Sequence, residues 1–239
     1  MVSSIRGTSP TPLGDPEPRE SSVEQRAHWE AALGERPDRY GAEASEPARA
    51  ALVLFRDRKI RDLLELGSGQ GRDTVFFAQA GLAVTAADFA SAAASTVAVK
   101  AEASGVTERV SAVECDVRQP LPFPDRSFDA CYAHMLFCMA LSESQLHALA
   151  AEIWRVLRPA GLCVYTARTT VDPDYGRGVP LGGDLYELDG FVVHYFSHDL
   201  VDRIAAGSGS PLFELLDVEE FEEGTLPRRL TRVTMCRTP

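Results

Sequence analysis

The chain has 239 residues, of which 45% are hydrophobic, and a formal net charge of −11 at pH 7. This length predicts one large domain whose core needs no disulfide or metal, and the five cysteines form no CxxC pair. The 35 acidic residues outnumber the 24 basic ones, which argues against a nucleic-acid partner and favours a small molecule. Because no apolar run approaches about 18 residues and the N-terminus lacks an apolar leader, we expect a cytoplasmic protein without a membrane partner. A monomer or a homodimer is expected.

The N-terminal part of the chain divides into a tail and a helical region. Residues 1–22 are rich in proline and serine and predict a disordered tail. A single domain is predicted over residues 23–239, and its first part, residues 23–60, predicts two helices. Trp29 and Tyr40 in this part are candidates to close over a bound ligand.

Strands and helices then alternate along the chain. Strands are predicted at 62–66, 82–87, 109–114, 127–133 and 162–167, and helices at 72–80, 90–103 and 145–157. Short apolar strands alternating with helices of about 10–15 residues are typical of βαβ units. We therefore expect a parallel sheet with right-handed crossovers.

This alternation ends in a long glycine-rich segment. Residues 169–197 contain five glycines and several aromatic side chains, and a segment of this length predicts a lid-like insertion. A helix over 197–206 and strands over 212–218 and 230–236 complete the chain. The acidic run 219–224 between the two strands predicts a solvated turn.

Three glycines at alternate positions follow the first predicted strand. Gly67, Gly69 and Gly71 come directly after Glu65-Leu66 and open the next helix. Glycine permits a tight turn and lets a ligand lie against the main chain. The free N–H groups at the start of the helix face such a ligand. A ligand-binding turn is therefore predicted here, with a plain strand-to-helix turn as the alternative.

Two carboxylates follow the next strands along the chain. Asp88 ends the second predicted strand, where a carboxylate can accept both hydroxyls of a ribose, and Asp116 follows the third. The carboxyl ends of parallel strands meet at the edge where open α/β sheets bind ligands. One adenosine-bearing ligand spanning these points is therefore predicted, and capping of the following helix is the alternative for Asp88.

The glycine spacing separates two classes of ligand. Dinucleotide-binding folds use G-x-G-x-x-G, because the helix N-terminus holds a pyrophosphate. Here the third glycine comes one residue early, and Glu65 beside the turn suits a cationic amine rather than a diphosphate. S-adenosylmethionine carries ribose, adenine, an ammonium and a sulfonium and has no phosphate. This ligand is favoured over NAD.

At this point the sequence resembles the class I S-adenosylmethionine-dependent methyltransferases. Residues 65–71 are similar to that family's first motif, and Asp88 to its acidic second-strand motif. Residues 115–117, 127–131 and 153–161 resemble three later motifs. More narrowly, residues 71–74 and 76–78 are similar to the tellurite-resistance-type and small-thiol methyltransferase branch.

The resemblance implies a fold and a cofactor site. The fold is a Rossmann-like, doubly wound α/β sheet of seven strands, mostly parallel with an antiparallel last strand and with helices on both faces. The cofactor is S-adenosyl-L-methionine. Its methionyl part is expected at Gly67, Gly69 and Gly71, its ribose at Asp88, and its adenine at Phe89, Asp116 and Val117, with Glu65 beside the ammonium.

The acceptor site is expected past the fourth strand or in the late insertion. His134 directly follows that strand and is the first candidate for contact with the acceptor, followed by His194 and Tyr195. The predicted activity is methyl transfer to a small molecule. A thiol relay through Cys131 and Cys138 is a further reading, suited to soft acceptors such as arsenite. An NAD-dependent oxidoreductase and a non-catalytic S-adenosylmethionine-binding module are the alternatives.

Overall fold

The computed structural model describes residues 19–35, 41–207, 211–223 and 227–239. Helix α1 (Arg19–Glu35) begins earlier than expected, so residues 19–22 belong to a helix and not to the predicted tail. The rest of that predicted tail lies outside the described residues.

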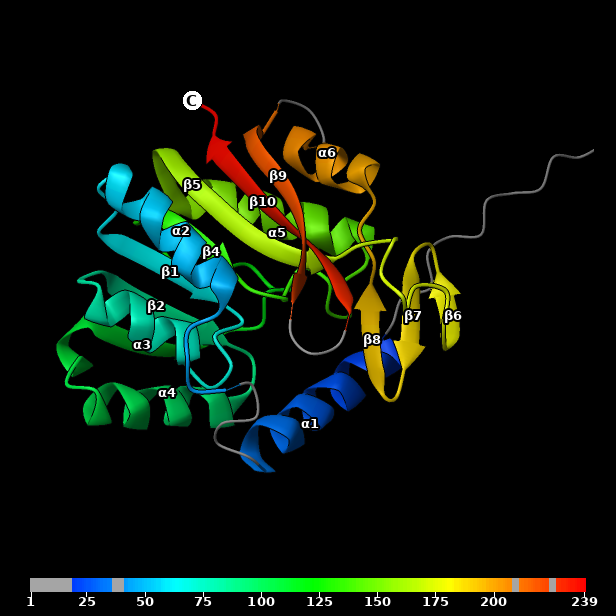
Figure 1. Cartoon of the computed structure of the whole chain (residues 1–239), viewed down its shortest axis with the longest axis horizontal. Coiled ribbons are helices and arrows are strands. Elements are labelled where there is room, and N and C mark those ends of the chain that lie inside the picture. The colour runs from blue at the N-terminus through cyan, green and yellow to red at the C-terminus, as the bar shows by residue number, and fades with distance from the viewer. Residues whose placement is uncertain (1–18, 36–40, 208–210, 224–226) are drawn as a thin grey trace, which may run out of the picture.

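Seven strands form the main sheet (Figure 1). From one edge to the other they are β3 (Val110–Glu114), β2 (Ala83–Asp88), β1 (Asp62–Leu66), β4 (Phe128–Ala133), β5 (Leu157–Arg168), β10 (Arg228–Arg237) and β9 (Phe213–Glu223). Strand β10 is the last in the chain and is antiparallel to both of its neighbours, β5 and β9. The pairs among the other strands are parallel. The predicted fold is therefore confirmed, with the antiparallel strand inserted one position inside the edge.

Helices cover both faces of this sheet (Figure 1). They are α2 (Glu46–Asp57), α3 (Arg72–Gln79) and α4 (Ser91–Ala103) on one face, and α5 (Glu143–Val156) and α6 (His198–Ala206) on the other, with a short 3-10 turn, Thr107–Arg109, before β3. The strands alternate between the two cores: Leu63 and Tyr132 pack with α2 and α3, whereas Leu64 and Cys131 pack with α5. None of the described helices is both long and apolar enough to cross a membrane.

Helix α1 is fixed to the sheet by capping a second helix. Ala90 stands at the N-cap of α4 and offers no side-chain hydrogen bond. The carboxylate of Glu30 on α1 takes that role, since it accepts hydrogen bonds from the backbone N–H groups of Ser91 (2.8 Å) and Ala92 (3.3 Å). A carboxylate at a helix N-terminus is also favoured by the helix dipole. This contact places α1 beside the carboxyl ends of the central strands.

The glycine-rich segment after β5 is built from strands rather than from an irregular loop. Strands β6 (Val179–Gly182), β7 (Leu185–Leu188) and β8 (Phe191–His194) form a small antiparallel sheet beside α1 (Figure 1). The Gln25 side chain on α1 donates a hydrogen bond to the Gly190 carbonyl (2.7 Å) and accepts one from the Val192 N–H (3.3 Å). The Phe191 ring lies 4.1 Å from His28 and 5.2 Å from Trp29. The small sheet and α1 thus support one another.

The predicted acidic turn is wrong for residues 219–223, which continue strand β9. Arginines of β10 stand directly opposite two of these glutamates, in the pairs Glu219–Arg232 and Glu222–Arg229. Opposite charges facing each other across an antiparallel pair favour the ladder. The strand is therefore extended toward the edge of the sheet at which the parallel strands end.

Candidate active site

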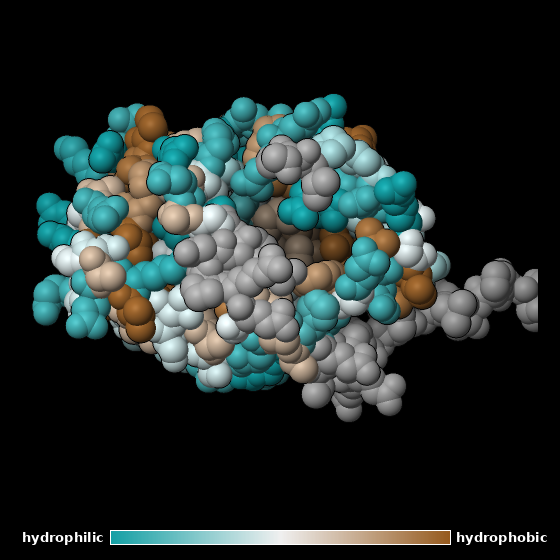
Figure 2. Space-filling view, turned by 60° about the horizontal axis from the view of Figure 1, so that its bottom comes forward, coloured by the Kyte–Doolittle hydropathy of each residue, from teal (hydrophilic) through white to brown (hydrophobic). Residues whose placement is uncertain are grey.

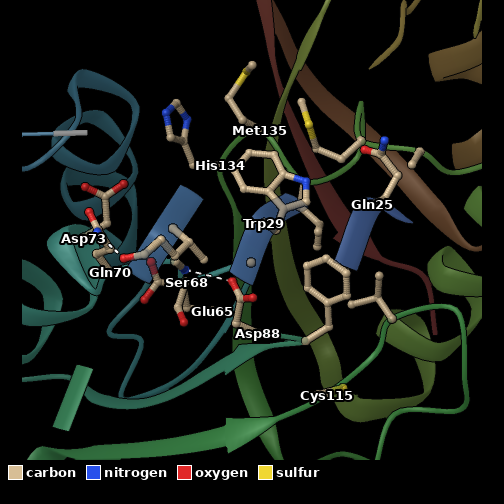
Figure 3. Close-up of a pocket in the computed structure, with 18 of the residues that line it drawn as sticks. Gln25, Trp29, Glu65, Ser68, Gln70, Asp73, Asp88, Cys115, His134 and Met135 are labelled. Atoms are coloured by element: carbon tan, nitrogen blue, oxygen red, sulfur yellow. Dashed lines mark hydrogen bonds between the residues drawn. The ribbon is translucent and has the colours of Figure 1, made fainter. Parts of the chain in front are cut away.

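A cavity of about 410 Å³ opens at the carboxyl ends of β1, β2, β3 and β4. Figure 2 shows a hollow in this face of the molecule with hydrophobic residues inside it. The sequence-predicted residues that line the cavity are Glu65, Gly67, Gly69, Asp88, Phe89, Asp116, Val117 and His134. In Figure 3, Glu65, Ser68 and Asp88 lie on one side of Trp29, and His134 and Met135 lie on the other. The cavity therefore has two ends of different composition.

The first two glycines form the floor of this cavity. Gly67 and Gly69 both have positive φ, 70° and 50°, which disfavours any residue with a Cβ. A Cβ on Gly67 would lie 3.1 Å from the Cβ of Leu136. The Gly67 N–H donates to the Ala87 carbonyl (2.8 Å), so the turn is tied to the end of β2. Both glycines line the cavity, and the side chain of Leu136 fills the space beside Gly67.

The third glycine serves helix packing. Gly71 is the N-cap of α3, has φ of 77° and is outside the cavity lining. A Cβ there would lie 2.9 Å from Val97 Cγ2 and 3.3 Å from Val97 Cα on α4. The prediction that Gly71 lines the methionyl part is therefore corrected, because its missing side chain makes room for α4.

Asp88 connects the glycine turn to the second strand. Its side chain is almost fully buried and accepts hydrogen bonds from the N–H groups of Gly69 (2.9 Å) and Ala90 (3.0 Å). Burial raises the pKa of Asp88 above its usual value, and these hydrogen bonds oppose the shift. A carboxylate has about four acceptor positions, so Asp88 can still accept two ligand hydroxyls.

Asp116 is held in a bidentate pair. Its carboxylate accepts from Nε (2.8 Å) and Nη2 (2.7 Å) of Arg118. Burial works against ionisation, but the hydrogen bonds and charge of Arg118 hold the pKa of Asp116 below its usual value. The Arg118 guanidinium also lies 5.9 Å from the centre of the Phe89 ring. These three residues line the cavity together with Cys115, Val117 and Asp88.

Glu65 is the most strongly perturbed carboxylate of the cavity. Burial, followed by the nearby charge of Asp73, raises the pKa of Glu65 to about 8, although the Thr74 hydroxyl donates a hydrogen bond to it. Asp73 itself accepts from the backbone N–H (2.8 Å) and the hydroxyl (2.7 Å) of Ser45, the N-cap of α2. At neutral pH Glu65 therefore holds a proton that a bound cation would displace.

His134 lies at the other end of the cavity, directly after β4. Its Nδ1 is 2.9 Å from the Thr166 hydroxyl, which also accepts a hydrogen bond from the Met135 N–H (2.9 Å). Its Nε2 is 3.5 Å from a carboxylate oxygen of Glu223, at the end of β9. Burial lowers the pKa of His134, and the charge of Glu223 opposes this shift. Neutral imidazole is therefore favoured.

The other two catalytic candidates lie outside the cavity lining. His194 is 4% exposed, and its Nδ1 is 2.7 Å from the Leu141 carbonyl. Tyr195 is fully buried, and its ring lies edge-to-face with Tyr175 and Tyr186. Both side chains are enclosed where the small sheet joins the main body, so their prediction as acceptor contacts is corrected. The predicted thiol relay is not assembled either, because the cysteines proposed for it are buried outside the lining.

Sequence reasoning missed several residues that complete the cavity. Those from α1 are Gln25 and Leu33, which lie on the same helix as the candidate Trp29. Those that follow β4 are Met135, Leu136 and Met139, and further charged ones are Arg72, Glu223 and Arg228. The apolar run after His134 was a usable signal, whereas the approach of α1 depends on its docking. Tyr40, the second aromatic candidate, lies outside the described residues.

The residues of the cavity fit S-adenosylmethionine. The buried carboxyl group of Glu65 is suited to an ammonium, and Asp88 to a ribose. The glycine turn leaves room for a chain against the backbone, and Phe89, Cys115 and Val117 provide an apolar surface for a flat ring. When bound, this cofactor supplies an activated methyl group on a sulfonium.

Comparison with known proteins identifies the domain. Residues 63–161 match a family model described as a methyltransferase domain. No curated protein matches the sequence. The match covers β1 through the start of β5 and contains the glycine turn, Asp88 and Asp116.

Solved structures with similar folds support this assignment. One is a Burkholderia thailandensis 1,6-didemethyltoxoflavin N1-methyltransferase with bound 1,6-didemethyltoxoflavin and S-adenosylhomocysteine (TM-score 0.71, 20% identity, 97% of this chain and 94% of that chain). Another is the N-methyltransferase NodS from Bradyrhizobium japonicum in complex with S-adenosylhomocysteine (TM-score 0.65, 13% identity, 90% and 100%). A third is the 4+2 cyclase SpnF (TM-score 0.65, 17% identity, 91% and 94%). At these identities the likeness shows the fold.

The domain match and the fold together confirm the predicted family, enzyme class and methyl donor, and the nicotinamide alternative is dropped. Residues 63–161 thus form a methyltransferase domain, and the chain has the fold of the class I S-adenosylmethionine-dependent methyltransferases.

Proposed function

We propose that this protein transfers the methyl group of S-adenosylmethionine to a small molecule bound in the same cavity. The observation that carries the proposal is the juxtaposition of the glycine turn and Asp88 with a second end of the cavity at His134 and Met135. Methyl transfer is an in-line displacement, so the protein has to align the two reactants and exclude water. One cavity with two ends suits this task.

In this proposal four sets of residues would hold the cofactor. The ammonium lies at Glu65, and the methionyl chain runs over Gly67 and Gly69. Asp88 accepts the two ribose hydroxyls, which a buried carboxylate with unused acceptor positions can do. The adenine lies on the apolar surface at Phe89 and Val117 and borders the Asp116–Arg118 pair.

A small-molecule acceptor is supported by the walls of the cavity. Gln25 and Trp29 of α1 line it, and the same side chains contact the small sheet of β6, β7 and β8. Such an enclosure suits a small ligand better than a polymer. The two similar methyltransferases described above are also named for small-molecule or N-methyl chemistry. The acidic net charge of −11 further disfavours a nucleic acid.

Helix α1, which lines the cavity, and the small sheet packed against it are together called the cover, and this cover is proposed to move. The two parts of the cover are joined by the Gln25 hydrogen bonds and by the contact of the Phe191 ring with Trp29. These contacts join segments far apart in the chain, so their loss leaves the hydrogen bonds of the main sheet intact. Closing of the cover on bound ligands then excludes water from the reaction.

Limited proteolysis tests this motion. Cleavage within residues 172–190 should slow when S-adenosylhomocysteine is bound, because a closed cover protects its own backbone. Equal cleavage rates with and without the ligand would contradict a moving cover.

A second candidate function is a reaction other than methyl transfer, or cofactor binding without turnover. The observation that favours it is the similarity of this fold to a protein named as a 4+2 cyclase. The cofactor cradle cannot separate these functions, whereas product formation can. In that case the cofactor binds and no methylated product forms.

The test of the proposed function is a methyl-transfer screen. Purified protein and S-adenosylmethionine are incubated with thiol, selenol, amine, phenol and carboxyl acceptors, and products are identified by mass. A product heavier by one methylene group, with S-adenosylhomocysteine formed in equal amount, is the expected result. Cofactor binding without any product across the panel favours the second candidate.

A further inference from the structure

We infer that Glu223 and His134 form a proton-accepting pair for an acceptor that has an apolar ring and carries an O–H or N–H group. This inference rests on the proposed methyl transfer and adds to it a positioning residue and a class of acceptor.

The fold brings the two side chains together from distant parts of the chain. His134 directly follows β4, and Glu223 ends β9. Strand β9 is antiparallel to β10, which is itself antiparallel to β5, so the end of β9 reaches the edge at which β1 and β4 also end. The two residues line the same cavity, with 3.5 Å between Nε2 of His134 and Oε1 of Glu223.

The imidazole is oriented from its other side. Thr166 on β5 is fully buried, and its hydroxyl oxygen lies 2.9 Å from Nδ1 of His134. With the hydrogen on Nδ1, this nitrogen donates to Thr166, and the lone pair of Nε2 is free to accept a proton. The Thr166 oxygen then accepts two hydrogen bonds, the second from the Met135 N–H, which matches its two lone pairs.

The charges that face His134 come from two elements. Glu223 of β9 and Asp73 of α3 favour the imidazolium, whereas Arg72 of α3 and burial disfavour it. Asp73 is engaged by the backbone N–H and hydroxyl of Ser45. Glu223 is therefore the carboxylate placed to stabilise a proton that arrives on Nε2.

The apolar part of the acceptor is assigned to the wall beside this pair. Met135, Leu136 and Met139 follow His134 in the chain and line the cavity, and Trp29 lines it from α1. Methionine side chains adapt to ligands of irregular shape, and an indole packs against flat rings. A ring that lies against this wall presents its O–H or N–H to Nε2.

The step balances as a simple displacement with proton transfer. A lone pair of the acceptor oxygen or nitrogen forms a bond to the methyl carbon, and the carbon–sulfur bond breaks with its electron pair left on sulfur. The acceptor proton passes to Nε2 of His134, so the positive charge of the sulfonium ends on the imidazolium beside Glu223. The proton then leaves to solvent. A base is needed because such acceptors arrive protonated at neutral pH.

The experiment uses 4-nitrophenol as the probe, because its phenolate absorbs visible light and its neutral form does not. The probe is titrated into the full chain with saturating S-adenosylhomocysteine at a pH where the free probe is mainly neutral. The variants are His134→Gln, Glu223→Gln and the matched control Glu222→Gln. Glu222 is the neighbour of Glu223 on β9, pairs with Arg229 at 2.7 Å and is half exposed outside the cavity lining.

We expect the bound probe to be ionised in the wild-type protein and in Glu222→Gln. The fraction of bound probe in the phenolate form should fall at least about 10-fold in His134→Gln, because the proton acceptor is lost. It should fall by a smaller factor in Glu223→Gln, which keeps the imidazole. A tenfold change corresponds to about 1.4 kcal/mol. A second readout is the His134 pKa measured by NMR titration, which Glu223→Gln should lower and Glu222→Gln should leave unchanged. A merely structural role of Glu223 would not move this pKa.

Three results would overturn the inference. They are a bound probe with the same ionisation in all four proteins, a wild-type protein that binds S-adenosylhomocysteine but not 4-nitrophenol, and an unchanged His134 pKa in Glu223→Gln. Calorimetry of S-adenosylhomocysteine on the same samples separates this failure from a failure of the proposed function. If the wild-type protein does not bind that cofactor product, the proposed function itself is contradicted.

Discussion

Replacing Asp88 by alanine should separate ligand binding from structure at the second strand. In the proposed arrangement, the carboxylate accepts two ribose hydroxyls in a buried site. Hydrogen bonds to a charged group contribute about 1.5 kcal/mol or more each, so the loss of both is about 3 kcal/mol. This corresponds to a roughly 100-fold weaker affinity for S-adenosylhomocysteine.

The same substitution also removes two bonds within the protein. The N–H groups of Gly69 and Ala90 lose the acceptors that now lie at 2.9 Å and 3.0 Å. At about 1.5 kcal/mol each, the free energy of unfolding should fall by about 3 kcal/mol. For a chain of this size the melting temperature then falls by about 6–12 °C.

The assay combines calorimetric titration of S-adenosylhomocysteine with thermal unfolding of the free protein. The control is Asp88→Asn, which keeps the size of the side chain and one acceptor oxygen but loses the charge, and should weaken binding less than alanine. If Asp88→Ala lowers the melting temperature and leaves the affinity unchanged, Asp88 only fixes the turn. The ribose assignment would then be wrong.

Three further predictions concern buried groups. Because burial raises the pKa of Glu65 to about 8, the folded chain holds a proton that the unfolded chain releases near 4.5. The free energy of unfolding should therefore fall as pH rises through this window, and thermal unfolding of Glu65→Gln should show a smaller fall. Binding of S-adenosylhomocysteine at neutral pH should release a proton in the wild type and not in Glu65→Gln. Calorimetry in buffers of different ionisation enthalpy measures this release. Gly71→Ala should lower the free energy of unfolding, measured with urea, by about 1–3 kcal/mol. Adding Val97→Ala should recover part of this loss, because it removes the atom that the new Cβ meets. The recovery should be incomplete, because the positive φ at position 71 remains strained. Burial lowers the pKa of His194, so the stability gained from burying the neutral imidazole should be lost as pH falls below about 6.5. His194→Gln should remove this part of the pH dependence of the free energy of unfolding. The same pH dependence in the wild type and the variant would contradict this expectation.

Local patterns were enough to predict the central sheet and its ligand-binding edge. Alternating apolar strands and helices define which strands are parallel, and glycine after a strand signals a turn open to a ligand. Gly67 and Asp88 were placed correctly at the edge for this reason. Gly71 was not, because a sequence does not show whether a missing Cβ makes room for a ligand or, as here, for Val97 of the neighbouring helix.

The rest depended on pairings between distant segments. Glu223 was assigned to a turn because its acidic neighbours suggest solvent, and only the arginines opposite them on β10 keep them in a strand. His194 and Tyr195 were assigned to the acceptor site from their place after β5, whereas the small sheet turns them inward. Gln25 gains its role only when α1 docks on β8.

In the proposed arrangement, the cavity binds both the adenosine and the methionyl part of S-adenosylmethionine. Calorimetric titration of the wild-type chain with S-adenosylhomocysteine, and separately with NAD, tests it most directly. We expect saturable binding of S-adenosylhomocysteine at one site per chain and no binding of NAD. Binding of NAD without binding of S-adenosylhomocysteine would contradict it.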